Sequence, residues 1–279
     1  MRVGVTGLSG FTGTYLGAAL KDAGHHPIAI SPDLTDATAL DHAVAEIAPD
    51  AVIHLAAKAF VASDDLAEFY TVNQVGSFNL LDAVARHRPG ARVVLASSAQ
   101  VYGEGASGTI AEDHPPAPAN HYALSKRAME MGASFWRDRL SILVARPFNY
   151  TGRGQENRYL IPKIVDHFRR RAAVIELGNI DVERDFGDVR AVVQAYVGLL
   201  GAADSDVPVN IATAMAHSVR DVLAMAGQLT GHHPEIVVNP AFVRNNDVQR
   251  LTGSNERLRT LLPHWAPVPL SDTLEWMLA

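Results

Sequence analysis

The stretch that decides the fold is Val3-Gly-Val-Thr-Gly7-Leu-Ser-Gly10-Phe-Thr-Gly13, near the start of the sequence. A short apolar run leads directly into three glycines, and a helical pattern follows. The first glycine permits a tight turn, the second lets the backbone approach a pyrophosphate, and the third lets the helix pack against the strand. The amides at the helix start then face the phosphates with the positive end of the helix dipole. The stretch therefore predicts a dinucleotide-binding turn between a strand and a helix.

Outward from this turn, β-branched runs alternate with helical patterns. The apolar runs lack polar alternation, as is typical of strands covered on both faces. We expect strands at 3–6, 28–30, 51–55, 92–96 and 142–145, and helices at 12–23, 38–47, 66–86 and 121–139. This alternation predicts the α/β class, with a doubly wound parallel sheet.

After Pro147 the pattern changes. Glycine and polar residues fill 149–157, the later elements are shorter, and the last fifty residues carry several prolines. We therefore expect a Rossmann-type domain from 1–150 plus about 185–212, and a smaller C-terminal lobe from 151–184 and 213–279. Ligands of such folds bind in the crevice at the carboxyl ends of the strands.

Composition excludes several classes of function. The 279 residues carry a net charge of -6, which gives no electrostatic case for a nucleic acid partner. The absence of cysteine excludes disulfides, thiolate nucleophiles and cysteine-bound metals. The histidine pairs 25–26 and 232–233 have no surrounding pattern of carboxylates and are interpreted as surface loops, so no metal is expected. The longest mostly apolar stretch, 191–203, is too short to cross a bilayer, and we expect a cytoplasmic protein without a membrane partner.

Tyr122 and Lys126 are the candidate proton-transfer pair. They stand four residues apart in a predicted helix, so both point from one face. A free phenol has a pKa of about 10. A lysine ammonium about 4 Å away contributes roughly 4 kcal/mol at an effective dielectric constant near 20, which would bring the phenol pKa close to neutrality. Ser98 follows a predicted strand, where its hydroxyl could polarise a carbonyl, and Ser97 is the alternative.

These residues stand among landmarks that resemble the extended short-chain dehydrogenase/reductase family. The landmarks follow the family's order over about half of the chain and are specific when taken together. They are the glycine turn, His54-Leu-Ala-Ala57, Asn73-Gln-Val-Gly76, Asn79-Leu-Leu-Asp82, Ser98-Ala-Gln-Val-Tyr-Gly103, Tyr122-Ala-Leu-Ser-Lys126 and Arg146-Pro-Phe-Asn149.

The resemblance implies an NAD(P)-dependent enzyme. It implies that Tyr122 relays the proton, that Lys126 also binds the nicotinamide ribose, and that Ser98 orients the substrate oxygen. His54 and Asn73 are interpreted as structural residues. Besides Tyr122 and Lys126, the residues expected to bind the cofactor are Gly7, Gly10, Phe11, Thr12, Gly13, Asp33, Leu34, Leu55, Ala56, Ala57 and Lys58.

The second half of the chain is similar to one branch of the family, the bacterial GDP-4-keto-6-deoxy-D-mannose reductases, which make GDP-D-rhamnose. A nucleotide diphosphate needs charge neutralisation, which arginine supplies best. The resemblance implies a nucleotide-sugar substrate bound by Ser98, Gln100, Tyr122, Asn149, Lys163, Arg184, Arg244 and Asp247. The sequence departs from the branch at two places. One is Ala191, where relatives often carry aspartate, and the other is the 153–158 loop, whose residues differ from the usual glycine-proline-glycine pattern.

Several reactions are compatible with this scaffold. A 4,6-dehydratase needs an extra acid and base after the catalytic hydroxyl residue, and Ala99 and Gln100 cannot transfer a proton. A 4-epimerase such as UDP-glucose 4-epimerase needs only Ser98, Tyr122 and Lys126, and remains the alternative to the reductase. A non-catalytic cofactor sensor is the more remote alternative, because such proteins usually lack the tyrosine–lysine pair.

The sequence gives weaker signals for the choice between NAD(H) and NADP(H) and for the oligomeric state. The second predicted strand ends Ile30-Ser31-Pro32, without the carboxylate that binds an adenosine ribose, so NADP(H) is slightly favoured over NAD(H). No arginine clamp for a 2′-phosphate is evident. Family members commonly dimerise through two long helices per subunit, so the resemblance implies a homodimer through 66–86 and 121–139.

Overall fold

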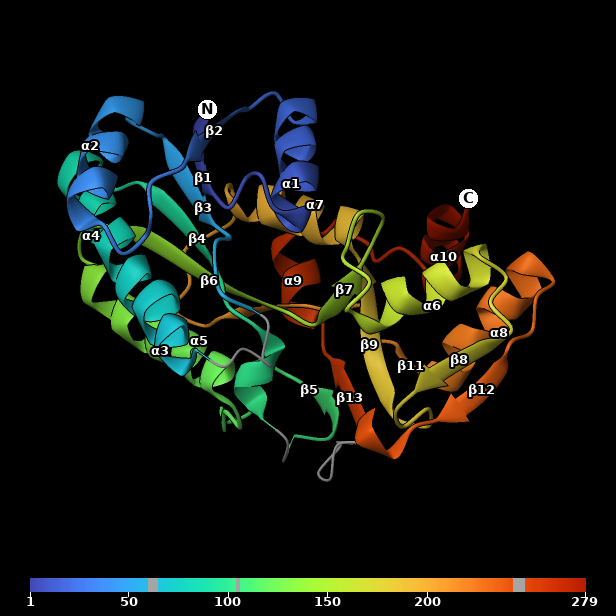
Figure 1. The fold of residues 1–279 in the computed structure, drawn as a ribbon. Coiled ribbons are helices and arrows are strands. Elements are labelled where there is room, and N and C mark those ends of the chain that lie inside the picture. Colours follow the sequence, from blue (N-terminus) through green and yellow to red (C-terminus); the bar gives the residue numbers. More distant parts are fainter. Residues whose placement is uncertain (60–64, 104–105, 243–248) are drawn as a thin grey trace.

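The computed structural model describes residues 1–59, 65–103, 106–242 and 249–279. Its first part is a six-stranded sheet with helices on both faces, and its second part is a smaller lobe to one side (Figure 1). The expected α/β class and doubly wound sheet are therefore confirmed.

The six-stranded sheet has the order β10-β6-β4-β3-β1-β2, and every neighbouring pair is parallel. Its strands are β1 (Arg2–Thr6), β2 (His26–Ile30), β3 (Ala51–His54), β4 (Arg92–Ala96), β6 (Ser141–Pro147) and β10 (Val209–Ile211). The chain moves outward from β1 to β2 and returns on the other side of β1 to form β3. This reversal is the switch point at which open α/β sheets bind ligands.

Helices cover this sheet in two groups. α1 (Phe11–Asp22) and α7 (Val189–Leu199) pack together on one apolar cluster with β1, β3 and β10. α2 (Ala37–Ile47), α4 (Ser77–His87) and α5 (His121–Ala133) pack on a second cluster. The apolar faces of these helices are buried because the strands they cover present almost no polar side chains.

The segment expected as a single helix at 66–86 has three parts. α3 (Leu66–Tyr70) leads into a π-helical segment (Thr71–Gly76), which leads into α4. Inside the π-helical segment, Asn73 is fully buried and its side chain bonds both backbone groups of Lys58. The helix expected at 121–139 likewise ends earlier: α5 stops at Ala133 and a 3-10 turn follows at Ser134–Trp136.

The second lobe contains the remaining strands. A mixed sheet has the order β11-β9-β13-β5, with β7 also pairing β9, and a two-stranded sheet joins β8 and β12. The strands are β5 (Gly108–Ile110), β7 (Asn149–Thr151), β8 (Val174–Leu177), β9 (Glu183–Asp188), β11 (Ala216–Ser218), β12 (Glu235–Val238) and β13 (Arg250–Gly253). The helices are α6 (Leu160–Arg169), α8 (Val219–Thr230), α9 (Glu256–Leu261) and α10 (Leu270–Leu278). α6, α8 and α10 share one apolar cluster with β8.

Buried Asp185 joins three segments of the mixed sheet. Its carboxylate lies on β9 and has no exposed surface. It accepts hydrogen bonds from the amide and hydroxyl of Thr213, the amide of Ala214, the hydroxyl of Thr252 and the amide of Gly253. One side chain thus connects β9 to β13 and to the loop before β11.

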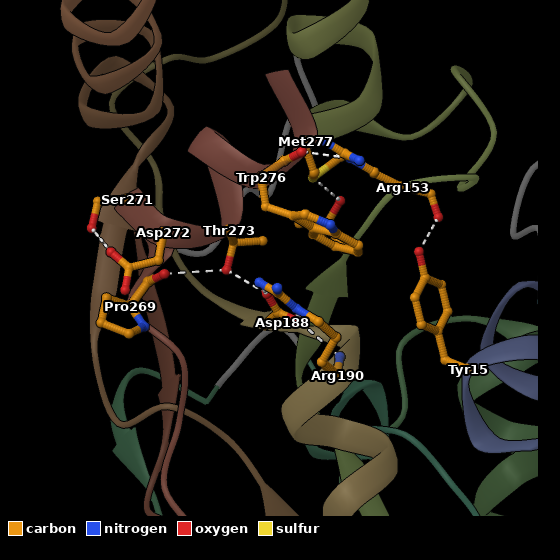
Figure 2. Close-up of polar contacts among 11 residues, drawn as sticks. Tyr15, Arg153, Asp188, Arg190, Pro269, Ser271, Asp272, Thr273, Trp276 and Met277 are labelled. Carbon is orange, nitrogen blue, oxygen red and sulfur yellow. Dashed lines mark hydrogen bonds and ion pairs between the residues drawn. The ribbon is translucent and has the colours of Figure 1, made fainter. Parts of the chain in front are cut away.

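Trp276 fastens the helix α10 to α1, to α7 and to the loop after β7 (Figure 2). The guanidinium groups of Arg190 and Arg153 lie 4.0 and 5.3 Å from the centre of its ring, and Tyr15 of α1 meets it edge-on at 5.9 Å. Arg153 also donates to the Trp276 carbonyl, and Tyr15 donates to the Arg153 carbonyl at 2.7 Å. The helix after the glycine turn therefore contacts both the 152–154 loop and the second lobe.

Candidate active site

The glycine turn lies at the end of β1, beside the switch point. Gly7 has φ 74°, a left-handed conformation that glycine adopts without strain. A Cβ on Gly13 would lie 2.1 Å from the Gly7 carbonyl oxygen, so only glycine permits this approach of helix and turn. A Cβ on Gly10 would also be close to that oxygen, at 3.3 Å. The turn thus has the shape that fits a dinucleotide pyrophosphate.

The other residues expected at the cofactor lie around this turn. Ala56 follows β3, and its amide would be 3.0 Å from a Cβ on Gly7. Its neighbours Leu55, Ala57 and Lys58 continue along the same loop, and the Lys58 ammonium pairs with Glu68 at 3.1 Å. Phe11 stacks on Tyr150, and the Thr12 hydroxyl lies 2.8 Å from the Tyr150 hydroxyl. Tyr150 was not anticipated from the sequence.

Asp33 and Leu34 form the turn after β2. The Asp33 carboxylate accepts hydrogen bonds from the amide and hydroxyl of Thr35, which lower its pKa. Leu34 is buried, its carbonyl accepts from Asn79, and a Cβ on Gly76 would lie 2.5 Å from the Leu34 Cβ. This turn is therefore fixed to the α4 side of the sheet.

His54 bridges two elements. Its Nδ1 lies 2.6 Å from the Thr6 hydroxyl on β1, and its Nε2 lies 2.8 Å from the Ser77 hydroxyl on α4. Burial, assisted by the charge of Lys126, lowers the pKa of His54 to about 3. The imidazole is therefore neutral, which agrees with its interpretation as a structural residue.

The structure brings Ser98, Tyr122 and Lys126 together. α5 is capped by Asn120, whose side chain accepts from the amide of Ala123, and it places Tyr122 and Lys126 on its buried face. The Ser98 side chain lies close enough to the Tyr122 phenol to lower the pKa of that phenol. Lys126 Nζ donates to the Ala96 carbonyl at the end of β4, with an N–O distance of 2.7 Å. All three groups therefore lie where β4 ends and α5 crosses it.

The expected direction of the Tyr122 pKa shift is wrong. Burial raises the pKa of the phenol above its ordinary value, the side chain of Ser98 opposes this, and electrostatic interactions with Tyr150 and Tyr159 add to it. The charge of Lys126 does not offset the effect of burial on the phenol pKa. Burial lowers the pKa of Lys126 to about 8, against the charge of Glu130. The four-residue spacing predicts that Tyr122 and Lys126 share one helix face, and they do. The ammonium, however, bonds a carbonyl, and burial of the phenol determines the direction of its pKa shift.

Ser97 has a different environment from Ser98. Its hydroxyl donates to Glu130, which forms a buried ion pair with Arg146. No function of Glu130 is evident from the sequence. The only signal was its spacing, eight residues after Tyr122 and four after Lys126 on the same helix.

The residues expected at the substrate are more dispersed. The Gln100 side chain accepts from Asn120 at 3.1 Å, and Asn149 is exposed at the start of β7. Lys163 on α6 donates to the Glu176 carbonyl and lies 4.9 Å from the centre of the Phe242 ring. Arg184 on β9 donates to the Glu183 carbonyl. Arg244 and Asp247 lie outside the described residues.

A cavity of about 600 Å³ lies elsewhere, between the 152–157 loop, α6 and the end of α10. None of the residues assigned from the sequence lines it. Within the described ranges, no cluster of three or more histidine, aspartate or glutamate side chains could hold a metal ion. Over the same part of the chain, every helix is too short or too polar to cross a membrane.

Comparison with known proteins identifies the family. Residues 3–212 match the NAD dependent epimerase/dehydratase family. The chain belongs to this family. It is 36% identical over 273 residues to the GDP-6-deoxy-D-mannose reductase of Pseudomonas aeruginosa, covering 92% of this chain and 89% of that protein. It is 32% identical over 268 residues to the GDP-6-deoxy-D-talose 4-dehydrogenase of Aggregatibacter actinomycetemcomitans, covering 94% and 91%.

Two solved structures extend this similarity to the fold. A Burkholderia cenocepacia protein, provisionally assigned as an epimerase, superimposes with a TM-score of 0.94 at 42% identity, covering 99% of this chain and 96% of that one. RMD from Pseudomonas aeruginosa, solved with NADPH, superimposes with a TM-score of 0.91 at 32% identity, covering 99% and 97%. An NAD(P) cofactor therefore fits both the family and the glycine turn described above.

Proposed function

We propose that the chain is an NAD(P)H-dependent reductase of a nucleotide-linked 4-keto-6-deoxyhexose, and that it converts GDP-4-keto-6-deoxy-D-mannose to GDP-D-rhamnose. The observation that carries this proposal is the buried Tyr122 phenol beside Ser98. With a pKa above neutrality, the phenol carries its proton at neutral pH, as the acid in a reduction must. Similarity to a GDP-6-deoxy-D-mannose reductase supports the choice of sugar.

In this reaction a carbonyl gains a hydride at carbon and a proton at oxygen. NAD(P)H bound beside the glycine turn would supply that hydride, leaving NAD(P)⁺. Tyr122 donates the proton to the C4 oxygen of the sugar, and Ser98 donates a hydrogen bond to the same oxygen as negative charge develops there. Lys126, held by the Ala96 carbonyl, stabilises the resulting tyrosinate until a proton returns from solvent. Lys126 also binds the nicotinamide ribose.

The rest of the substrate would lie over the second lobe. We propose that Asn149 and Gln100 bind the sugar and that Arg184 binds the diphosphate, with Lys163 as a weaker phosphate ligand. Arg244 is proposed as a second diphosphate ligand and Asp247 as an acceptor from ribose hydroxyls. Arginine suits the diphosphate because its planar fork bonds two oxygens at once.

The test is NADPH consumption with GDP-4-keto-6-deoxy-D-mannose, followed by nicotinamide absorbance. The variant Tyr122→Phe removes the donated proton and should lower kcat by at least about 100-fold while NADPH binding survives. Tyr70→Phe is the matched control, because Tyr70 bonds His121 at the surface outside the proposed site, and should keep its activity. Unchanged turnover in Tyr122→Phe would show that another group donates the proton.

A 4-epimerase is the second candidate, favoured by the similarity to the Burkholderia protein. It would use the same Ser98, Tyr122 and Lys126, but it would retain NAD through purification and consume none. A thermal-shift screen of GDP, UDP and dTDP with NADH and NADPH discriminates the two, because ligands of the native state raise its Tm. We expect GDP and NADPH to give the larger shifts. A preference for UDP would favour the epimerase.

We also propose a homodimer through α5 and its neighbours. Phe69, Leu80 and Leu81 are buried in the core of one subunit and are not available. Other apolar side chains on these segments are exposed: Val75 (48%), Leu124 (46%), Met131 (59%) and Phe135 (81%). Phe135→Glu should yield monomers in light scattering, whereas Leu229→Glu, at an exposed site on α8, should not. A dimer that survives Phe135→Glu would contradict this interface.

We also propose a division of the chain into two domains. The dinucleotide-binding domain is proposed to comprise 1–150 with about 185–212, supported by the packing of α7 on α1 and the pairing of β10 with β6. The substrate lobe is proposed to comprise 151–184 and 213–279. A cytoplasmic location also stays a prediction.

A further inference from the structure

Three successive turns of α5 place Tyr122, Lys126 and Glu130 on one buried face. The residues are four apart, so their side chains lie one above another along the helix. Their exposed fractions are 8%, 2% and 8%. Tyr122 and Lys126 belong to the proposed proton relay, whereas Glu130 takes no direct part in it.

Each of these side chains contacts a different residue in one short stretch at the end of β4. The pairs are Lys126 with the Ala96 carbonyl, Glu130 with the Ser97 hydroxyl, and Tyr122 with the Ser98 hydroxyl. The position of the Ser98 hydroxyl relative to the phenol therefore depends on all three contacts. The Glu130 contact lies next to Ser98 in the chain.

Glu130 is itself held from the neighbouring strand. Arg146 of β6 donates to both of its carboxylate oxygens, at 2.8 and 2.6 Å, and Arg127 donates to one of them at 3.0 Å. Arg146 is 2% exposed, and its guanidinium lies 4.9 Å from the centre of the Tyr102 ring. Two buried charges of this kind are often no more stabilising than apolar side chains of similar volume. The contribution of this pair to stability is therefore not by itself a sufficient reason for burying two charges here.

We propose that Glu130 is a positioning residue for the reduction: it holds Ser97, and with it the backbone that carries Ser98, beside the Tyr122 phenol, and it places a negative charge one helical turn from the Lys126 ammonium. The inference rests on the proposed function, because it assigns Glu130 a task that serves Tyr122 and Lys126.

The groups around Lys126 explain why this charge matters. Tyr122 and Glu130 face it from α5, and His54 faces it from β3 as a neutral imidazole. Burial lowers the pKa of Lys126 to about 8, and Glu130 is the group that opposes the decrease. Without the carboxylate charge, Lys126 would lose its proton within the neutral range and could no longer stabilise a tyrosinate.

The direct test is the titration of Lys126 by NMR with ¹³C-labelled lysine, which needs no substrate. The chain has four lysines, Lys21, Lys58, Lys126 and Lys163, so Lys126→Met assigns the signal. In Glu130→Gln the midpoint should fall by about 1 to 2 pH units, as a charge one helical turn away predicts. Asp166→Asn, which removes a carboxylate from a surface ion pair with Arg170, should leave it unchanged. An unchanged midpoint in folded Glu130→Gln would overturn the proposal.

A second pair of variants keeps the test decisive. If Glu130→Gln fails to fold because Arg146 is left unpaired, Glu130→Gln combined with Arg146→Met removes both charges at similar volume, and the same fall is expected. Ser97→Ala keeps the charge but breaks the contact with Glu130. It should lower kcat several-fold without moving the alkaline limb of kcat/KM, which should move in Glu130→Gln. Full activity in Ser97→Ala would overturn the positioning role of that contact.

The two proposals fail separately. A shifted Lys126 titration without reduction of any 4-keto sugar would support the inference about the charge and count against the proposed substrate alone.

Discussion

His54 should make the protein less stable as the pH falls below neutrality. The imidazole has no exposed surface and contacts two hydroxyl groups, of Thr6 and Ser77. Burial first, and the charge of Lys126 second, lower its pKa from 6.5 to about 3. The unfolded chain therefore binds a proton below pH 6.5 that the folded protein excludes.

The size of the effect follows from these two values. Because the folded pKa is the lower one, the stability that neutral His54 contributes is complete above pH 6.5 and is lost as the pH falls toward 3. The loss increases by about 1.4 kcal/mol per pH unit within this window. At about pH 5 it amounts to about 2 kcal/mol in the free energy of unfolding.

Chemical denaturation at about pH 8 and about pH 5 measures this loss, with His54→Gln as the comparison. Glutamine retains an amide that can bond a hydroxyl but does not titrate. Of the 12 histidines, the other 11 are present in both proteins, so their contribution cancels in the difference. The wild type should lose about 2 kcal/mol more than the variant between these pH values. Equal losses would refute the idea that folding excludes the proton from His54.

Two further predictions concern close packing and a buried carboxylate. Gly13→Ala should abolish the thermal shift produced by NADPH, because its Cβ would lie 2.1 Å from the Gly7 carbonyl oxygen. Gly24→Ala, where no atom lies within 4 Å of the new Cβ, is the control for changes in overall fold, although its own φ of 74° adds some strain. Asp185→Asn should lower the free energy of unfolding by at least about 2 kcal/mol in urea denaturation, because an amide nitrogen cannot accept the bonds that now reach both carboxylate oxygens. Unaltered NADPH binding in the first variant, or unaltered stability in the second, would contradict the geometry described.

Much of the fold could be predicted because it is encoded locally. Apolar runs without polar alternation predicted five of the six strands of the first sheet to within a few residues, and β2 and β6 extend further than expected. The three-residue edge strand β10 was not predicted. The π-helical segment at Thr71–Gly76 could not be predicted, because its distinguishing feature is a contact. The side chain of Asn73 turns inward to bond Lys58, fifteen residues earlier in the chain. The helical periodicity of the sequence carries no information about this contact between Asn73 and Lys58.

The candidate site divides in the same way. The pairing of Tyr122 with Lys126 follows from spacing on one helix, and the structure places both beside Ser98. The direction of the phenol pKa did not follow, because it depends on how deeply the tertiary structure buries the ring. The role of Glu130 could not be predicted either, because it depends on contacts with Ser97, just after β4, and with Arg146 on β6.

The position of Trp276 makes its fluorescence a reporter of movement between the two parts of the protein. Its indole is enclosed by two cations and a phenol that come from the loop after β7, from α7 and from α1. If ligand binding rotates the second lobe against the sheet, the polarity around this ring must change with it. The chain has three tryptophans, so replacing Trp136 and Trp265 with phenylalanine would leave Trp276 as the single fluorescent indole. The wavelength of its emission maximum would then report that movement in real time.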